Sequence, residues 1–184
     1  ETINTYELAV DYNPTFKIHK SINLFRYNIK DLILAVPDAR GTTFTFQNRG
    51  AQDGQGMAWE MDWQIARDLK ATANYAFQLS ENKNTHSDAG NAPHHQVYAR
   101  VQWNFLPEWS LVPQMDWVLD RKRVAGDNRP PVKDYATVDL TLRRTDIADH
   151  LEVALIVKDI FDATIIEPSP YTSPASAIPY DFPM

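Results

Sequence analysis

The chain has 184 residues, no cysteine and a formal net charge of -6 at pH 7. The acidic balance argues against a nucleic-acid partner, which would require a basic face. Without cysteine, a disulfide framework and a cysteine-based zinc site are both excluded. No stretch approaches the ~20 consecutive apolar residues that a membrane-spanning helix needs, whereas the strands of a membrane barrel are only half apolar and escape such a test.

Three central segments, 57–65, 69–79 and 97–105, alternate with a period of two residues between apolar or aromatic side chains and carboxylate, amide, lysine or arginine side chains. Successive side chains of a strand point to opposite faces, so each segment has one apolar and one polar face. Large aromatics such as Trp63 and Phe105 lie at the ends of these segments. The pattern is typical of an all-β, antiparallel up-and-down transmembrane β-barrel with lipid outside and a polar lumen inside.

Eight strands are predicted, most of them about ten residues or longer, as a tilted membrane strand requires. They cover residues 3–12, 17–33, 43–65, 69–80, 95–105, 109–121, 134–144 and 150–158. A Gly-rich stretch interrupts the third. In the second, Ile22 and Leu24 share one face but Phe25 and Tyr27 lie on the other, which predicts a bulge that switches the register.

The predicted connections alternate in length. Residues 13–15, 66–68, 106–108 and 145–149 form short ones, and residues 34–42, 81–94, 122–133 and 159–184 form long ones. Outer-membrane barrels have short periplasmic turns and long extracellular loops. We therefore expect the long connections to lie together at the extracellular end. Both ends of the chain then fall on that side, which favours a piece of a larger barrel over a complete one.

Five segments resemble those of TonB-dependent outer-membrane receptors. They are residues 23–33, Phe46-Gln47-Asn48 with Gly54-Gln55-Gly56-Met57-Ala58-Trp59-Glu60, Ala92-Pro93-His94-His95, Arg129-Pro130-Pro131-Val132-Lys133-Asp134-Tyr135, and Asp159-Ile160-Phe161-Asp162. The second segment is similar to the family's N-x-G…G-x-E-x-E pattern, and the last is similar to N-L-F-D. The order of these segments across nearly the whole chain makes the resemblance specific.

The resemblance implies that residues 1–184 form the C-terminal part of the barrel. They would supply about eight consecutive strands of an about 22-stranded barrel, with the plug domain and the final strand absent from this chain. It also implies the outer membrane of a Gram-negative bacterium, and TonB-energised uptake of a scarce ligand such as an iron-siderophore complex, a cobalamin or a glycan. The implied partners are outer-membrane lipid and lipopolysaccharide, the TonB complex through the missing plug, and a small-molecule or metal-chelate ligand. No cofactor and no enzymatic activity are expected.

The polar face holds acids, amides and bases. We predict that a common lumen wall contains Glu7, Asp11, Glu60, Asp62, Lys70, Asn74, Gln78, Arg100, Gln102, Asn104, Gln114, Asp116 and Asp139. Glu60 and Asp62 would serve acid–base catalysis only if their surroundings separated their pKa values, and nothing nearby does this. A hydrated wall with cross-strand ion pairs to Arg100 or Lys70 is favoured. No phosphate-binding loop or nucleophile elbow is present.

One long connection contains His86, Asp88, His94 and His95. Histidine and carboxylate can bind a metal, but this spacing fits no fixed motif, so no metal site is predicted. Contact of His94 or His95 with an extracellular ligand remains open.

The next long connection is basic, with Arg121, Lys122, Arg123 and Arg129. Such a cluster attracts anions, so it can capture an anionic ligand such as a ferric catecholate. The alternatives are contact with lipopolysaccharide phosphates or simple hydration. The candidate ligand-binding residues are therefore His94, His95, Arg121, Arg123 and Arg129.

The aromatic face has two interpretations, a lipid belt and a sugar-binding stripe, and strict alternation favours the belt. Val97, Ala99, Val101, Trp103 and Phe105 are expected to face lipid, together with Leu111, Met115 and Trp117. Two rival hypotheses stay open: a complete eight-stranded barrel with a structural or adhesive role, and a soluble ligand-binding β-barrel with its aromatics inward.

Overall fold

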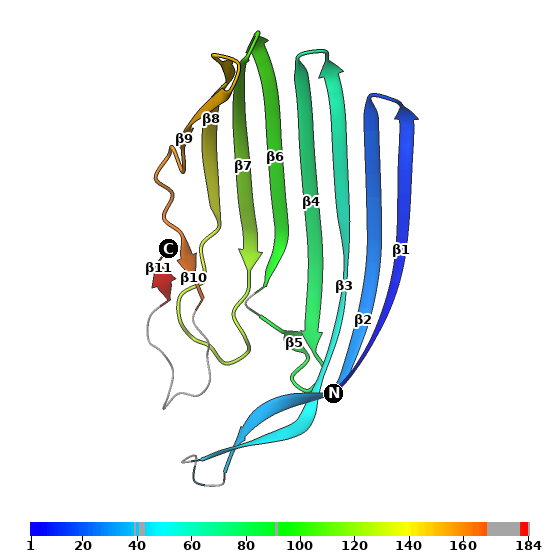
Figure 1. Ribbon diagram of the computed structural model, residues 1–184. Coiled ribbons are helices and arrows are strands. Elements are labelled where there is room, and N and C mark those ends of the chain that lie inside the picture. Colours follow the sequence, from blue (N-terminus) through cyan, green and yellow to red (C-terminus); the bar gives the residue numbers. More distant parts are fainter. Residues whose placement is uncertain (39, 41–42, 91, 169–180, 184) are drawn as a thin grey trace.

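Each long strand pairs antiparallel with its neighbours in the sequence (Figure 1). The computed structural model describes residues 1–38, 40, 43–90, 92–168 and 181–183. The sheet runs in the order β1 (Thr2–Thr15), β2 (Ile18–Pro37), β3 (Phe44–Ala66), β4 (Leu69–Asn82), β6 (Pro93–Leu106), β7 (Trp109–Arg121), β8 (Tyr135–Ile147) and β9 (Leu151–Val157). All eight predicted strands are confirmed.

Three short strands were not predicted. β5 (Ser87–Asp88) pairs with β4, and β10 (Ile166–Glu167) pairs with β11 (Phe182–Pro183) in a separate two-stranded sheet. Among the described residues no helix is long and apolar enough to cross a membrane. Within this part of the chain β1 and β9 are the outermost strands of the large sheet and do not pair with each other.

The connections are sorted by length as predicted. The turns after β1, β3, β6 and β8 lie at the upper end of the sheet in Figure 1, and the long connections lie at the lower end. The hairpin of β2 and β3 extends beyond the other strands at the lower end. The predicted long connections include residues 39, 41–42, 91, 169–180 and 184, which lie outside the described residues.

The predicted bulge of β2 is present, but it lies beyond the residues whose pattern suggested it. The β1–β2 pairing runs without a shift from Thr2 opposite Lys30 to Tyr12 opposite Lys20. Against β3, the register shifts only beyond Ile29, around Leu32. The stretch of β2 that contains Leu24 and Phe25 pairs with both neighbouring strands without a shift. Phe25 and Tyr27 therefore project to the face opposite that of Ile22 and Leu24.

The predicted Gly-rich interruption of β3 is absent, and the strand runs unbroken from Phe44 to Ala66. Its glycines leave space for aromatic side chains of β2. Phe25 lies directly opposite Gly56, and Tyr27 lies opposite Gly54. A Cβ atom on Gly54 would come within 2.2 Å of the Tyr27 ring, and one on Gly56 within 2.5 Å of the Phe25 ring. Aromatic side chains commonly cover strand glycines in this way.

Very little of the sheet is buried. Among the described residues the buried hydrophobic side chains are Val112 and Val132, whereas Trp103 is 46% exposed, Trp117 41% and Leu8 60%. A soluble protein rarely leaves a large contiguous apolar surface in water. The sheet therefore has no core of its own, and its apolar face requires a covering that lies outside the described residues.

We expect Gly56→Ala to destabilise the protein by about 1–3 kcal/mol, the range of overpacking substitutions. The new Cβ would lie 2.2 Å from the backbone oxygen of Phe77, which cannot move aside as a flexible side chain can. Denaturant titration of the intact protein measures the effect. Ala58→Ser, two residues along the same face and beside an open hollow, is the matched control, and an equal loss there would contradict the packing explanation.

Candidate functional site

The polar residues predicted for the lumen share one face of the sheet. The register places Ser21, Glu60, Asn74, Tyr98 and Asp116 side by side across five strands. The neighbouring row contains Asp62, Thr72, Arg100, Gln114 and Asp139. The predicted facing is confirmed, because residues opposite each other in a sheet project to the same side.

This polar wall is linked by cross-strand contacts. Lys70 Nζ lies 3.3 Å from Asp62 Oδ1, and the Thr72 hydroxyl donates to the same oxygen at 2.6 Å. Gln114 Nε2 donates to Asp139 Oδ2 at 3.1 Å. Lys70 and Asp62 are nearly half exposed, so their ion pair contributes little to stability. These partly exposed cross-strand contacts are typical of a polar surface that is in contact with water.

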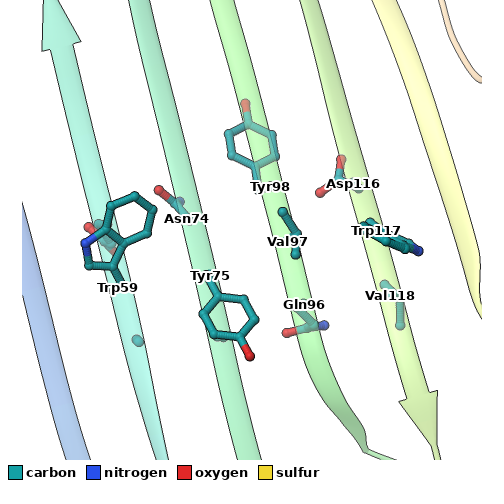
Figure 2. A pocket seen from close by; sticks show the side chains of 12 residues that line it. Trp59, Asn74, Tyr75, Gln96, Val97, Tyr98, Asp116, Trp117 and Val118 are labelled. Carbon is teal, nitrogen blue, oxygen red and sulfur yellow. The ribbon is translucent and has the colours of Figure 1, made fainter.

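The opposite face is apolar and aromatic. Figure 2 shows Trp59, Tyr75, Val97 and Trp117 across four neighbouring strands, where the register places them opposite one another. A hollow of about 330 Å³ lies among these side chains and their neighbours. Trp103 and Leu111 lie opposite each other further along this face, so the predicted common side of Val97, Val101 and Trp103 is confirmed.

At the end with the long connections, His94 is buried between two carboxylates. Its Nε2 lies 2.6 Å from Asp88 Oδ2, and its Nδ1 lies 2.8 Å from Asp120 Oδ2. The side chain is 9% exposed. Within the described residues no group of three or more histidine, aspartate or glutamate side chains is arranged to hold a metal ion.

His95 lies on the other face from His94. It is opposite Phe77, its Nδ1 is 2.7 Å from the Tyr75 hydroxyl, and its ring centroid is 5.0 Å from that of Phe77. The two neighbouring histidines therefore do not form one cluster, because adjacent residues of a strand point to opposite sides.

Arg121 is almost completely buried. Its guanidinium lies 3.1 Å from Glu167 Oε1 and donates to the Lys133 carbonyl at 2.8 Å. It also lies over the Tyr135 ring, 5.0 Å from the centroid. Arg121 therefore connects the end of β7 to β10.

Arg123 and Arg129 form an ion-pair cluster with Asp127 and Asp181. Arg123 contacts both Asp181 oxygens, at 3.0 and 2.5 Å, and Arg129 lies 2.6 Å from Asp127 Oδ2. Asp127 is 1% exposed, and hydrogen bonding to Arg129 lowers its pKa from 3.8 to about 2. We call these four residues the Arg–Asp cluster.

Sequence reasoning found the basic residues of this end but missed their acidic partners. Asp127 lies within the same connection as Arg123 and Arg129, so its position offered a clue. Glu167 and Asp181 are 46 and 58 residues from the arginines they contact, and no local pattern indicates such pairs.

Residues 1–160 match the family model described as "TonB dependent receptor-like, beta-barrel". The chain belongs to this family. No curated protein matches the sequence.

Solved receptors share the fold of this TonB-dependent receptor segment. The FrpB iron transporter of Neisseria meningitidis has a TM-score of 0.73 at 17% identity, covering 98% of this chain and 29% of FrpB. The ferric yersiniabactin uptake receptor FyuA of Yersinia pestis has a TM-score of 0.71 at 20% identity, covering 92% and 27%. A mutant of the ferric enterobactin receptor PfeA of Pseudomonas aeruginosa has a TM-score of 0.72 at 18% identity, covering 87% and 26%. The chain spans less than a third of the length of each.

Membership of this receptor barrel family explains the exposed apolar face. Trp109 and Trp117 are eight residues apart on that face of β7, about 27 Å along a strand. At a tilt of about 40° this corresponds to about 20 Å along the membrane normal, close to the ~25 Å apolar band of outer-membrane barrels. Arg144 lies over the Trp109 ring, 5.3 Å from its centroid, as expected for a cation at the edge of such a band.

We expect Val101→Arg to cost about 2–4 kcal/mol, the cost of a cation near the midplane of the apolar band in outer-membrane barrels, because Val101 lies on the apolar face. Gln102→Arg, one residue along on the polar wall, is the control and should have a mild effect. Unfolding of the intact receptor from lipid vesicles measures both. Equal losses would mean that the two faces do not differ in their surroundings.

The Arg–Asp cluster should hold the connection at 122–134 above about pH 4 and release it as the pH falls toward 2. The pKa of Asp127 is lowered in the folded state, so its stabilising effect is present above its unfolded value and is lost as the pH falls through the folded one. A spin label at Ala125 should become more mobile over this range. In the Asp127→Asn variant the label should already be mobile at about pH 5. An immobile label in that variant would contradict the role of the cluster.

Proposed function

We propose that this chain forms part of the barrel wall of an outer-membrane receptor that takes up a scarce ligand, with an iron-siderophore complex as the leading candidate. The observation that carries the proposal is the family match over residues 1–160 together with the two-faced sheet, which is apolar on one face and polar on the other. The TonB complex would supply energy through the plug domain of the receptor. No enzymatic role is proposed, because the polar wall offers only hydrated ion pairs.

The sorted connections support a direction for this receptor. Long connections gather at one end and short turns at the other, as in barrels whose long loops are extracellular. Ligand would then approach the end that carries His94 and the Arg–Asp cluster. Outer-membrane lipid would cover the face of Trp59, Tyr75 and Trp117.

Of the five candidate ligand residues, Arg123 and Arg129 are the best suited to bind an anion. Both share Asp181, from a distant part of the chain, and an anionic chelate offers oxygens that can compete for the same guanidinium groups. His94, His95 and Arg121 are engaged by neighbouring side chains. For these three we propose that they shape the extracellular end around the ligand.

Uptake of radiolabelled ligand by cells that carry or lack the intact receptor tests the transport proposal. Ferric catecholate and ferric hydroxamate are labelled in their iron and cobalamin in its cobalt, and the three ligands are offered separately. We expect uptake of one of the ferric chelates, and its loss in cells without TonB. Equal uptake of all three ligands with and without the receptor would refute the proposal.

Arg129→Gln should weaken binding of a ferric catecholate about tenfold, because a charge-assisted contact is lost. Arg143→Gln is the control, since Arg143 pairs with the half-exposed Glu152 at 3.0 Å near the short-turn end. Affinities are measured on the purified intact receptor. The same loss in both variants would point to a general charge effect.

A further inference from the structure

His94 has both ring nitrogens within hydrogen-bonding distance of carboxylate oxygens. Asp88 Oδ2 is 2.6 Å from Nε2, and Asp120 Oδ2 is 2.8 Å from Nδ1. Asp88 belongs to β5, whereas His94 and Asp120 lie at the paired ends of β6 and β7. The three side chains thus join residues 83–90, in the connection after β4, to the ends of β6 and β7.

The hydrogen-bonding chemistry of the three side chains determines which form of His94 can contact both carboxylates. An ionised carboxylate only accepts hydrogen bonds, and a neutral imidazole has one donor and one acceptor nitrogen. Only the imidazolium form of His94 can therefore donate to Asp88 and Asp120 together. After loss of the proton, one nitrogen lone pair would face a carboxylate oxygen in a nearly buried site, which is unfavourable.

The surrounding charges also favour the imidazolium form. Asp120 is hydrogen-bonded by Lys122, and its backbone N–H donates to Asp134 Oδ1 at 2.8 Å. On β4, Glu81 is engaged by His86 at 3.1 Å and by Lys83 at 4.0 Å. The ring itself therefore contacts two carboxylates, those of Asp88 and Asp120, and the ammonium group of Lys122 offsets part of the charge of Asp120.

We propose that Asp88, His94 and Asp120 form a proton-dependent clamp that fixes residues 83–90, the described part of the connection after β4, at acid pH and releases them as the pH rises. The direction follows from the hydrogen-bond donors: the protonated ring donates to Asp88 and Asp120 through its two nitrogens, whereas the neutral ring can donate to only one of them. Histidine is the side chain that normally titrates between about pH 5 and 8.

Release of the clamp would free a close contact between two long connections. Gly90 has a φ of +77°, and a Cβ atom there would lie 2.5 Å from the backbone nitrogen of Val124. Backbone therefore packs directly on backbone at this point. Asp88 Oδ1 also accepts the Gly90 N–H at 2.7 Å, so movement of Asp88 would pull this contact apart and open the extracellular end between the two connections.

Spin labels at Thr85 and Ala125, exposed positions of the two connections, test the clamp in the intact receptor in lipid nanodiscs, with any cysteines elsewhere replaced. We expect a narrow distance distribution at about pH 5 that broadens at least about twofold at about pH 8.5, on either side of ordinary histidine titration. A distribution that does not change with pH would overturn the proposal.

Asp88→Asn is the decisive variant, because its amide can donate to neutral His94 while its oxygen still accepts the Gly90 N–H. The distance distribution of this variant should stay narrow at both pH values. In His94→Gln the width of the distribution should no longer change with pH. His86→Gln, in the same connection but with an exposed ring, is the matched control and should respond like the unmodified receptor. Persistence of the broadening in Asp88→Asn, or its loss in His86→Gln, would refute the assignment to His94.

Discussion

The need to satisfy backbone hydrogen bonds in a medium without water governs this structure. Lipid offers no partner to a free N–H or C=O group, so strands that cross it must pair along their full lengths. Pairing of sequence neighbours achieves this with the shortest connections, and it produces the order from β1 to β9 with only the small β5 beside it. The alternation of faces, the sorted connections and the exposed aromatics all follow from it.

The same constraint explains which parts of the fold could be predicted from the sequence. Strand positions were predictable because a period of two survives wherever one face meets lipid and the other meets water. The register of β2 was not, because Phe25 and Tyr27 are aromatics on the polar face. Their positions make sense only beside Gly56 and Gly54, and those contacts depend on a pairing that periodicity alone does not specify.

At the end with the long connections, residue types could be predicted from the sequence but their contact partners could not. The basic run was visible, but the carboxylates that neutralise Arg121 and Arg123 come from Glu167 and Asp181, far along the chain. Sequence proximity also placed His94 and His95 together, although strand geometry sends them to opposite faces. Connections that fold back on one another create such contacts, and local patterns do not encode them.

At the end with the long connections, Arg123 and Arg129 are neutralised by Asp127 and Asp181. A free basic cluster would act as a static electrostatic funnel for anions. Here the arginines are closely paired with acids, so an anion must compete with Asp127 or Asp181 for the same donors. Such competition couples ligand binding to the conformation of the connections, because each displaced carboxylate belongs to a different segment. In the proposed receptor, the residues that bind the anion would then be the same residues that hold the connections together, so that binding could change the shape of this end.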